Sequence, residues 1–168
     1  MKSKIHTAIA GALVLGINSL ILANSMSPSM AQHAGHTHVH TTYSAGEPGD
    51  PAKPARTINV NMREADEKML FAPDRIEVRR GEQIRFVLRN SGELEHEFVL
   101  ATTEENLKHA EEMKNNAEMG HDDPNAKRVL PRKSKELVWK FTKAGTFEYG
   151  CLIPGHREAG MAGTIVVK

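Results

Sequence analysis

Two stretches of the chain, residues 57–101 and 129–168, alternate apolar and polar positions with the period of two that is typical of β-strands. In QIRFVLRN, for example, Ile84, Phe86 and Leu88 fall on one face of the predicted strand. About seven such segments, rich in β-branched and aromatic residues and separated by turn residues, predict an all-β sandwich or barrel. The segments are TINVNM, RIEVRR, QIRFVLRN, EFVLA, KELVWKF, GTFEYGC and AGTIVVK.

The segment between these stretches, residues 102–128, is highly charged and interrupts the strand pattern. Thr102 or Thr103 can cap a helix there, acidic residues follow in its first turn, and Gly120 and Pro124 are residues at which a helix ends. The sequence therefore predicts a partly helical insert on the outside of the sandwich, near one end of its sheets.

Residues 1–31 have the pattern of a secretory signal peptide. Two lysines precede an apolar run from Ala8 to Ala23, and small residues stand where a signal peptidase cleaves. A retained membrane anchor is the alternative, but the run is shorter than the ~20 apolar residues that a span needs. We expect cleavage after Ala31, export to the periplasm and no membrane span in the mature chain.

Residues 32–56 are rich in Gly, Pro, Ala, Thr and His and contain almost no large apolar side chains. Such a segment cannot bury enough apolar surface to order itself, so we predict a flexible tail before a folded domain of residues 57–168. Four histidines of the tail can chelate a metal ion, and an ordinary solvated polar tail is an equally good interpretation. These histidines are His33, His36, His38 and His40.

The charge balance argues against a nucleic-acid-binding protein. The chain has 22 basic and 21 acidic side chains. Loss of the signal peptide removes Lys2 and Lys4 and no acidic residue, so the mature chain keeps 20 basic side chains and has a net charge of −1 with histidine neutral. A nucleic-acid-binding face would need a clear basic excess.

The chain has a single cysteine, Cys151, which cannot form the intrachain disulfide that an oxidising compartment favours. His156 and Met161 follow it in YGCLIPGHREAGMAGTIVV, where Pro154 and Gly155 make a tight turn. A thiolate, two imidazoles and a weak axial thioether form the ligand set of blue-copper electron-transfer sites. This loop supplies one imidazole, so the second must come from elsewhere in the chain.

His96 is the best candidate for the second imidazole, because it opens a core-like strand directly after a turn in SGELEHEFVLA. Simpler interpretations remain: Cys151 as a small buried apolar residue, Met161 as core packing and His96 as a structural histidine. Cys151 and His156 also allow a nucleophile with its base, but no oriented third group is visible. A multicopper oxidase would need several His-x-His pairs inside folded domains. We therefore predict a copper protein that is not an enzyme.

The segment YGCLIPGHREAGMAGTIVV, with the upstream EHEFVL, resembles the ligand motif of the cupredoxin family of small blue-copper proteins. The resemblance covers residues 57–168 and implies a Greek-key β-sandwich with one type 1 copper near one end. It also implies one-electron transfer, with an exposed edge of His156 as the exit for the electron. The copper ligands that it implies are His96, Cys151, His156 and Met161.

Two positions depart from the family pattern. Glu97 follows the first histidine where many members have Asn or Ser, and Glu95 precedes it where azurins have Gly. The order of signal peptide, His-rich tail and cupredoxin domain with a His- and Met-bearing insert resembles the CopI group of periplasmic cupredoxins associated with copper tolerance. We therefore predict copper tolerance or handling with one-electron redox chemistry. The alternative is a dedicated electron carrier that serves a respiratory or redox chain.

The insert carries a second group of soft ligands. His109 and Met113 are four residues apart, hence on one helical face, and Met119 and His121 follow them. These four residues can bind Cu(I), or they simply decorate an exposed helix. The expected partners are copper ions, which can include additional ions at the tail or insert, and a redox partner such as a cytochrome or a copper-handling protein.

Overall fold

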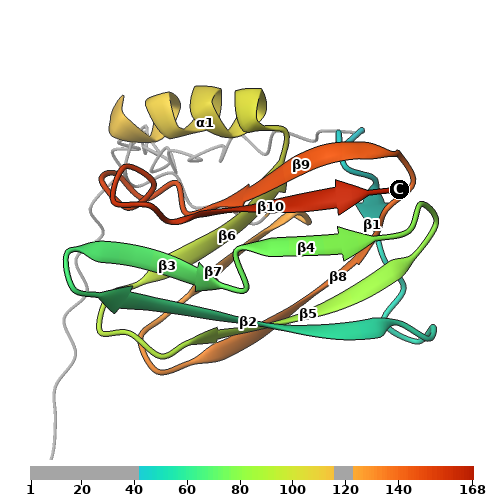
Figure 1. Ribbon diagram of the computed structural model, residues 1–168, viewed down its shortest axis with the longest axis horizontal. Helices are drawn as coiled ribbons and strands as arrows, with labels where there is room; N and C mark the ends of the chain where they lie inside the picture. Colours follow the sequence, from blue (N-terminus) through green and yellow to red (C-terminus); the bar gives the residue numbers. More distant parts are fainter. Residues whose placement is uncertain (1–41, 116–122) are drawn as a thin grey trace, which may run out of the picture. The chain divides into compact units, whose positions relative to one another are not determined.

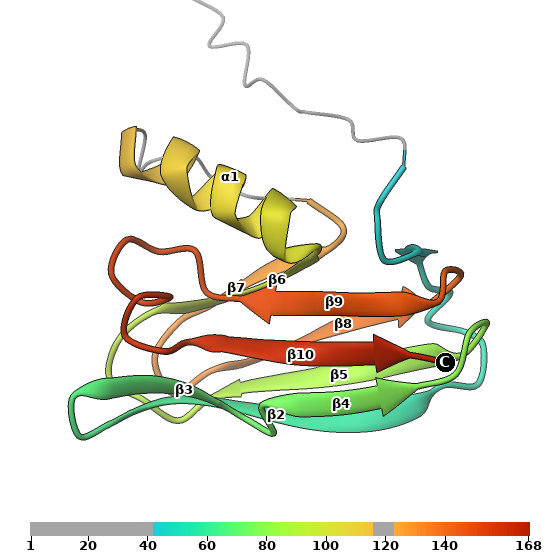
Figure 2. The ribbon, with the colours of Figure 1, turned by 45° about the horizontal axis from the view of Figure 1, so that its top comes forward.

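A computed structural model of the chain describes residues 42–115 and 123–168. The predicted signal peptide and the four tail histidines lie outside the described residues, as do Met119 and His121. The described strands form two five-stranded sheets that pack face to face, with one helix on the outer side of the second sheet (Figures 1 and 2). The predicted all-β Greek-key sandwich with a partly helical insert is confirmed.

The first sheet has the strand order β1-β8-β5-β2-β3, and the second has the order β4-β10-β9-β6-β7. The pairs β2/β5 and β4/β10 are parallel, and every other pair is antiparallel. The first sheet contains β1 (Glu47–Pro48), β2 (Arg56–Ala65), β3 (Lys68–Ala72), β5 (Gln83–Asn90) and β8 (Ser134–Lys140). The second contains β4 (Arg75–Val78), β6 (His96–Ala101), β7 (Ala126–Val129), β9 (Gly145–Gly150) and β10 (Ala162–Val167).

The core lies between the sheets and follows from the alternation in the sequence. Ile84, Phe86 and Leu88 are fully buried from β5, as predicted, and Trp139 is fully buried from β8. Side chains of successive strand residues point to opposite faces, so each sheet offers one apolar face to the other. Aromatic rings fill the middle, where the ring centroids of Phe98 and Tyr149 stack 5.0 Å apart.

Helix α1 (Thr103–Asn115) packs on the outer face of β6 and β9. Thr102 caps it: the Glu105 N–H donates to Thr102 Oγ1 at 3.1 Å, and the Thr102 N–H donates back to Glu105 Oε2 at 2.8 Å. This reciprocal pair is a capping box. The predicted end at Gly120 lies outside the described residues, and Pro124 lies in the turn before β7.

Two predicted boundaries are wrong. The insert ends before residue 128, because Ala126–Val129 pairs with β6. The folded part begins before residue 57, because Ala45 is fully buried and the ring of Tyr43 meets that of Trp139 edge-on at 5.2 Å. Strand β1 pairs with β8, so the described part of the predicted tail, residues 42–56, packs on the first sheet.

Within the described residues, none of the helical segments has the length and apolar character needed to cross a membrane.

Candidate metal centre

The predicted ligand loop, residues 151–161, connects β9 to β10 at one end of the sandwich (Figure 1). The β2–β3 turn and the β5–β6 connection lie at the same end of the sheets. This places His96, the first residue of β6, beside the loop that carries the other predicted ligands. The predicted position of the site at one end of the sheets is thus matched by the fold.

Three donor atoms converge at this end. His96, Cys151 and His156 each offer one ligand atom, and these atoms lie within 4.8 Å of one another. The two Nδ1 atoms of His96 and His156 are 3.3 Å apart, and Cys151 Sγ is 3.4 Å from His156 Nδ1. His96 and Cys151 are fully buried. Such a group of one thiol and two imidazoles has the donor atoms and the spacing to share a single metal ion.

Met161 lies next to this group. Its side chain is fully buried, its N–H donates to the His156 carbonyl at 3.1 Å, and its carbonyl accepts from the Cys151 N–H at 3.1 Å. The backbone of Met161 is therefore hydrogen-bonded to both loop ligands. Its thioether role remains a prediction, because the described contacts fix its backbone and its burial only.

The loop holds its shape through its own backbone. The His156 N–H donates to the Ile153 carbonyl at 3.0 Å, closing a turn in which Gly155 has a φ of 89°. A positive φ of this kind is readily adopted by glycine and is strained for other residues. The Met69 N–H on β3 donates to the Ala159 carbonyl at 3.0 Å, which fastens the loop to the opposite sheet. The predicted tight turn between Cys151 and His156 is present.

Burial shifts the pKa values of the three donor side chains. It raises the pKa of Cys151 to about 12, although a hydrogen bond from the Glu97 N–H to Sγ at 3.3 Å opposes this. Burial lowers the pKa of His96, and burial together with the neighbouring His96 lowers the pKa of His156. Neutral imidazoles are metal ligands, whereas a thiolate in this apolar pocket needs a cation to stabilise it.

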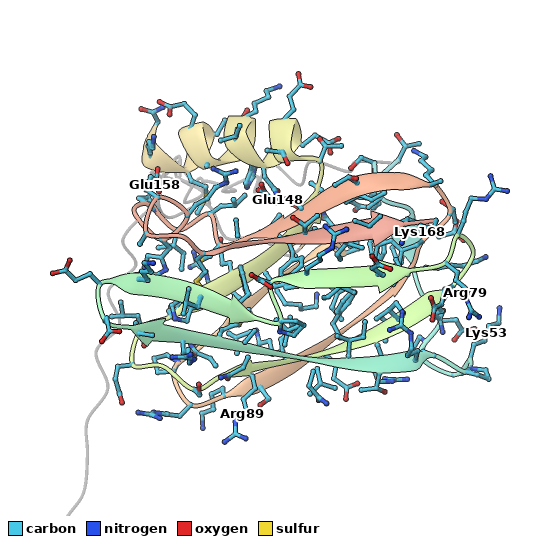
Figure 3. All side chains as sticks on the ribbon, in the orientation of Figure 1. Lys53, Arg79, Arg89, Glu148, Glu158 and Lys168 are labelled. Carbon is cyan, nitrogen blue, oxygen red and sulfur yellow. The ribbon has the colours of Figure 1, made fainter. Side chains whose placement is uncertain are left out.

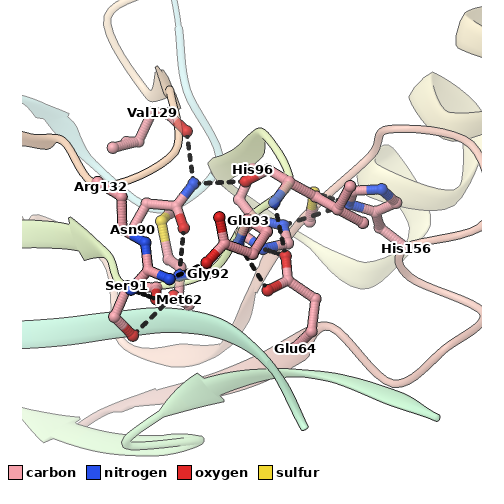
Figure 4. Close-up of polar contacts among 12 residues, drawn as sticks. Met62, Glu64, Asn90, Ser91, Gly92, Glu93, His96, Val129, Arg132 and His156 are labelled. Carbon is pink, nitrogen blue, oxygen red and sulfur yellow. Dashed lines mark hydrogen bonds and ion pairs between the residues drawn. The ribbon is translucent and has the colours of Figure 1, made fainter. Parts of the chain in front are cut away.

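Two polar residues that the sequence analysis missed shape the site (Figure 4). Glu64 Oε1 lies 2.9 Å from His96 Nε2. Asn90 is buried and donates to the carbonyls of Leu94 and Val129, at 2.7 and 2.9 Å. Both lie on core-facing positions of their strands, in line with Met62 on β2 and Leu88 on β5. A polar residue at a core-facing position is the sequence signal that would have found them.

The two glutamates that depart from the family pattern share one arginine. Arg128 Nε lies 2.9 Å from Glu95 Oε1 and 3.0 Å from Glu97 Oε1. Glu97 points away from the core, toward the side that α1 covers, because it alternates with His96 along β6. Burial raises the pKa of Glu97, and the nearby Arg128 and His109 oppose that effect.

His156 is largely buried, with an exposed fraction of 9%, so only a small part of its ring reaches the surface. A pocket of about 290 Å³ beside it is lined by Met113, Glu95, Arg128 and apolar loop residues. Lys114 Nζ lies 3.8 Å from Glu158 Oε1, so the C-terminal turn of α1 contacts the ligand loop. Figure 3 shows Glu158 beneath that end of the helix.

Of the predicted secondary ligands, the structure describes His109 and Met113 only. Met113 is buried and lines the pocket beside His156, so it is not exposed decoration of the helix. His109 Nδ1 lies 3.6 Å from Glu112 Oε2. Among the described residues, His96, Cys151 and His156 form the one cluster of histidine, cysteine and acidic side chains that is close enough to hold a metal ion.

The donor set fits copper better than other common metals. Thiolate and thioether sulfurs favour Cu(I), and imidazole suits both oxidation states. Structural zinc sites take four tetrahedral Cys or His ligands, and calcium and magnesium take oxygen ligands. A buried set with one thiol and two imidazoles, hydrogen-bonded to the backbone of the buried Met161, is therefore a suitable site for a type 1 copper ion.

Comparison with known proteins agrees with this assignment. The family of copper binding proteins, plastocyanin/azurin family, matches residues 58–168. The copper-resistant cuproprotein CopI of Rubrivivax gelatinosus is 54% identical over 81% of this chain and 81% of that protein. The protein of the same name from Pseudomonas aeruginosa is 38% identical over 73% of this chain and 82% of its own length. Auracyanin B, a solved structure, is 25% identical with a TM-score of 0.59, over 74% of this chain and 96% of that chain. The chain belongs to the copper-binding plastocyanin/azurin family, the cupredoxins.

Proposed function

We propose that the chain is a periplasmic copper-tolerance cupredoxin that binds one type 1 copper ion and changes its oxidation state by one electron. The observation that carries this proposal is the convergence of His96, Cys151 and His156 in a chain 54% identical to a copper-resistant cuproprotein. The predicted signal peptide supports the location, since export brings the protein to the compartment that meets external copper first. In this proposal the chain handles copper and is not an enzyme.

In the proposed site, His96, Cys151 and His156 hold the ion and Met161 approaches as the weak axial ligand. When bound, copper supplies a one-electron couple between Cu(I) and Cu(II). The donors sit on a rigid sheet end and a hydrogen-bonded loop, so they resist rearrangement between the two oxidation states. A site with this property loses little energy to reorganisation when an electron is exchanged.

The small exposed area of His156 bears on the choice between copper tolerance and electron transport. Met113 and the contact between Lys114 and Glu158 bring α1 over the ligand loop, which restricts close approach of a large redox partner. A dedicated electron carrier is better served by an open histidine edge. This feature supports copper tolerance as the main role, with a cytochrome or copper-handling protein as a partner for slower electron exchange.

The test combines growth with spectroscopy. A strain without the gene should grow poorly at elevated copper, the unaltered gene should restore growth, and a Cys151→Ser gene should not. Purified protein should bind one copper ion per domain at the main site and show an intense thiolate-to-copper absorption band. Unchanged copper tolerance of the deletion strain would contradict the tolerance role, and a colourless copper-loaded protein would contradict the site.

Additional copper at the tail and insert is a second part of the proposal. Copper stoichiometry should be measured with and without residues 32–41, because residues 42–56 pack on the first sheet and their removal would disturb the fold. Loss of extra copper with residues 32–41, while the band remains, would support a storage role for the tail histidines. An unchanged stoichiometry would assign all bound copper to the domain.

A further inference from the structure

The carboxylate of Glu64 lies against the outer nitrogen of the buried ligand His96 (Figure 4). Nδ1 of His96 faces the donor cluster, 3.3 Å from His156 Nδ1, while Nε2 faces Glu64 Oε1 at 2.9 Å. A metal bound by Nδ1 leaves the single proton of a neutral imidazole on Nε2. Nε2–H therefore donates to Glu64, which selects the tautomer that ligation requires.

The same carboxylate is held by backbone donors. The Leu94 N–H donates to Oε1 and the Glu93 N–H to Oε2, both at 3.0 Å. Together with His96 Nε2, these two N–H groups give the carboxylate three donors, and hydrogen bonds to a carboxylate favour its charged form. The three donors thus hold the negative charge of Glu64 in a fixed position beside His96.

The contact joins the two sheets at the metal end. Glu64 belongs to β2 of the first sheet and His96 to β6 of the second. Glu64 continues the core-facing positions of Val60 and Met62, where an apolar side chain would be expected. A carboxylate at such a position costs desolvation energy, so its retention requires the compensation that its three donors provide.

The β5–β6 connection closes around the carboxylate because residue 92 has no side chain. A Cβ atom built on Gly92 would overlap both carboxylate oxygens of Glu64. Since those atoms end a flexible side chain, a larger residue at position 92 would displace the carboxylate and leave the backbone in place. The chain thus contains a second position through which the Glu64–His96 contact can be broken.

We propose that Glu64 is a positioning residue for His96 whose negative charge stabilises bound Cu(II) relative to Cu(I) and so lowers the reduction potential of the site. The inference rests on the proposed function, because it presumes copper on His96 Nδ1. A carboxylate that accepts the outer N–H of a ligating histidine raises the basicity of that ligand. The more basic imidazole and the nearby negative charge both favour the more highly charged ion.

The first experiment measures the reduction potential of Glu64→Gln in the full chain. The amide oxygen still accepts from His96, but the charge is lost, so Cu(II) binding should weaken about tenfold relative to Cu(I). For a one-electron couple that is a rise of about 59 mV. Glu67→Gln is the matched control, because Glu67 lies exposed in the β2–β3 turn and its substitution changes the net charge equally. The control should leave the potential almost unchanged.

The second variant, Gly92→Ala, keeps every charge and moves the carboxylate away. It should raise the potential in the same direction as Glu64→Gln, and the two changes combined should add little. It also keeps the test decisive if Glu64→Gln folds poorly. Potentials of both variants equal to those of the unaltered protein and of Glu67→Gln, with the thiolate-to-copper band intact, would overturn the role of Glu64 and leave the proposed function standing. Absence of the band in the unaltered protein would overturn both.

Discussion

Cys151 determines the character of the site at the scale of single residues. It is fully buried, and burial raises the pKa of its thiol to about 12, so the metal-free protein holds a neutral thiol at pH 7. Copper must displace that proton to obtain a thiolate ligand. The thiolate is also the source of the charge-transfer colour by which the site can be recognised.

Cys151→Ser should abolish the intense absorption of the copper-loaded protein, because a hydroxyl cannot supply soft sulfur-to-copper charge transfer. Any copper that still binds should give the spectrum of a site with nitrogen and oxygen ligands. Visible absorption and electron paramagnetic resonance of the Cu(II)-loaded variant provide the measurement, with far-ultraviolet circular dichroism to verify the fold. A blue or green variant would remove Cys151 from the ligand set.

Met161→Leu should keep copper bound and raise the reduction potential by tens of millivolts, given that a tenfold change in relative affinity is about 59 mV. The loss of a weak axial sulfur removes a donor and makes the site drier, which disfavours Cu(II). Met62→Leu is the matched control, since Met62 is equally buried in the core but lies on β2. Loss of copper from Met161→Leu alone would give that residue a larger role than an axial ligand.

At the scale of secondary-structure elements, the sequence predicts the strands that have a strong hydrophobic pattern. All seven predicted strand segments are strands. In segments such as β4, β5 and β10, alternation leaves one way to bury the apolar face, whereas β6 is an apolar run that is buried at every position. Strands β1, β3 and β7 were not predicted. Strand β1 has two residues, and β7 buries Ala126 and Val129, which are three apart and so break the period of two.

Some residues of the candidate site can likewise be predicted from the sequence, and others cannot. Cys151 and His156 follow from their spacing within one loop, and His96 follows from its place at the start of a strand. Glu64 is 32 residues from His96 in the chain, and their contact depends on how the end of β2 meets the β5–β6 connection. The small exposed area of His156 likewise depends on the direction in which α1 runs, which the composition of the insert does not determine.

Thr102→Ala should lower the free energy of unfolding by about 1 kcal/mol, since it removes one half of the capping box that starts α1. Thr103→Ala is the control, because Thr103 is the first helical residue and is exposed; its effect should stay within ~0.5 kcal/mol. Urea unfolding of the metal-free variants measures both changes. Equal losses of stability in the two variants would contradict the assignment of Thr102 as the residue that caps α1.

At the scale of the whole molecule, the chain ahead of β2 belongs to the folded domain. Asp50 and Gln83 exchange two hydrogen bonds, with the Asp50 N–H donating to Oε1 at 2.8 Å and Gln83 Nε2 donating to the Asp50 carbonyl at 3.0 Å. The Gly49 N–H donates to the Val138 carbonyl at 2.9 Å. The composition of residues 42–56 hides this attachment, because a few small and aromatic contacts, chiefly Ala45 and Tyr43, replace a continuous apolar run.

The tightest point of this attachment is Gly46, which has a φ of 140°. A Cβ atom there would overlap the carbonyl oxygen of Lys140 on β8, a backbone atom that cannot swing aside. Gly46→Ala should therefore detach β1 and expose Ala45 and the ring of Tyr43. We expect a loss of about 2–4 kcal/mol of unfolding free energy, from backbone strain together with lost burial.

Gly81→Ala is the control that separates backbone strain from lost burial. Gly81 also has a positive φ, 87°, but nothing lies near the position of its Cβ, so this variant should cost only the strain of roughly 1–2 kcal/mol. Urea unfolding measures both, and faster proteolysis between residues 42 and 56 should appear in Gly46→Ala alone. Gly81 lies in the β4–β5 turn. Because this turn and β1 lie at the opposite end of the sheets from the ligand loop (Figure 1), both variants should keep the thiolate-to-copper band. A Gly46→Ala protein as stable as Gly81→Ala would show that the N-terminal segment adds nothing to the domain beyond its own backbone geometry.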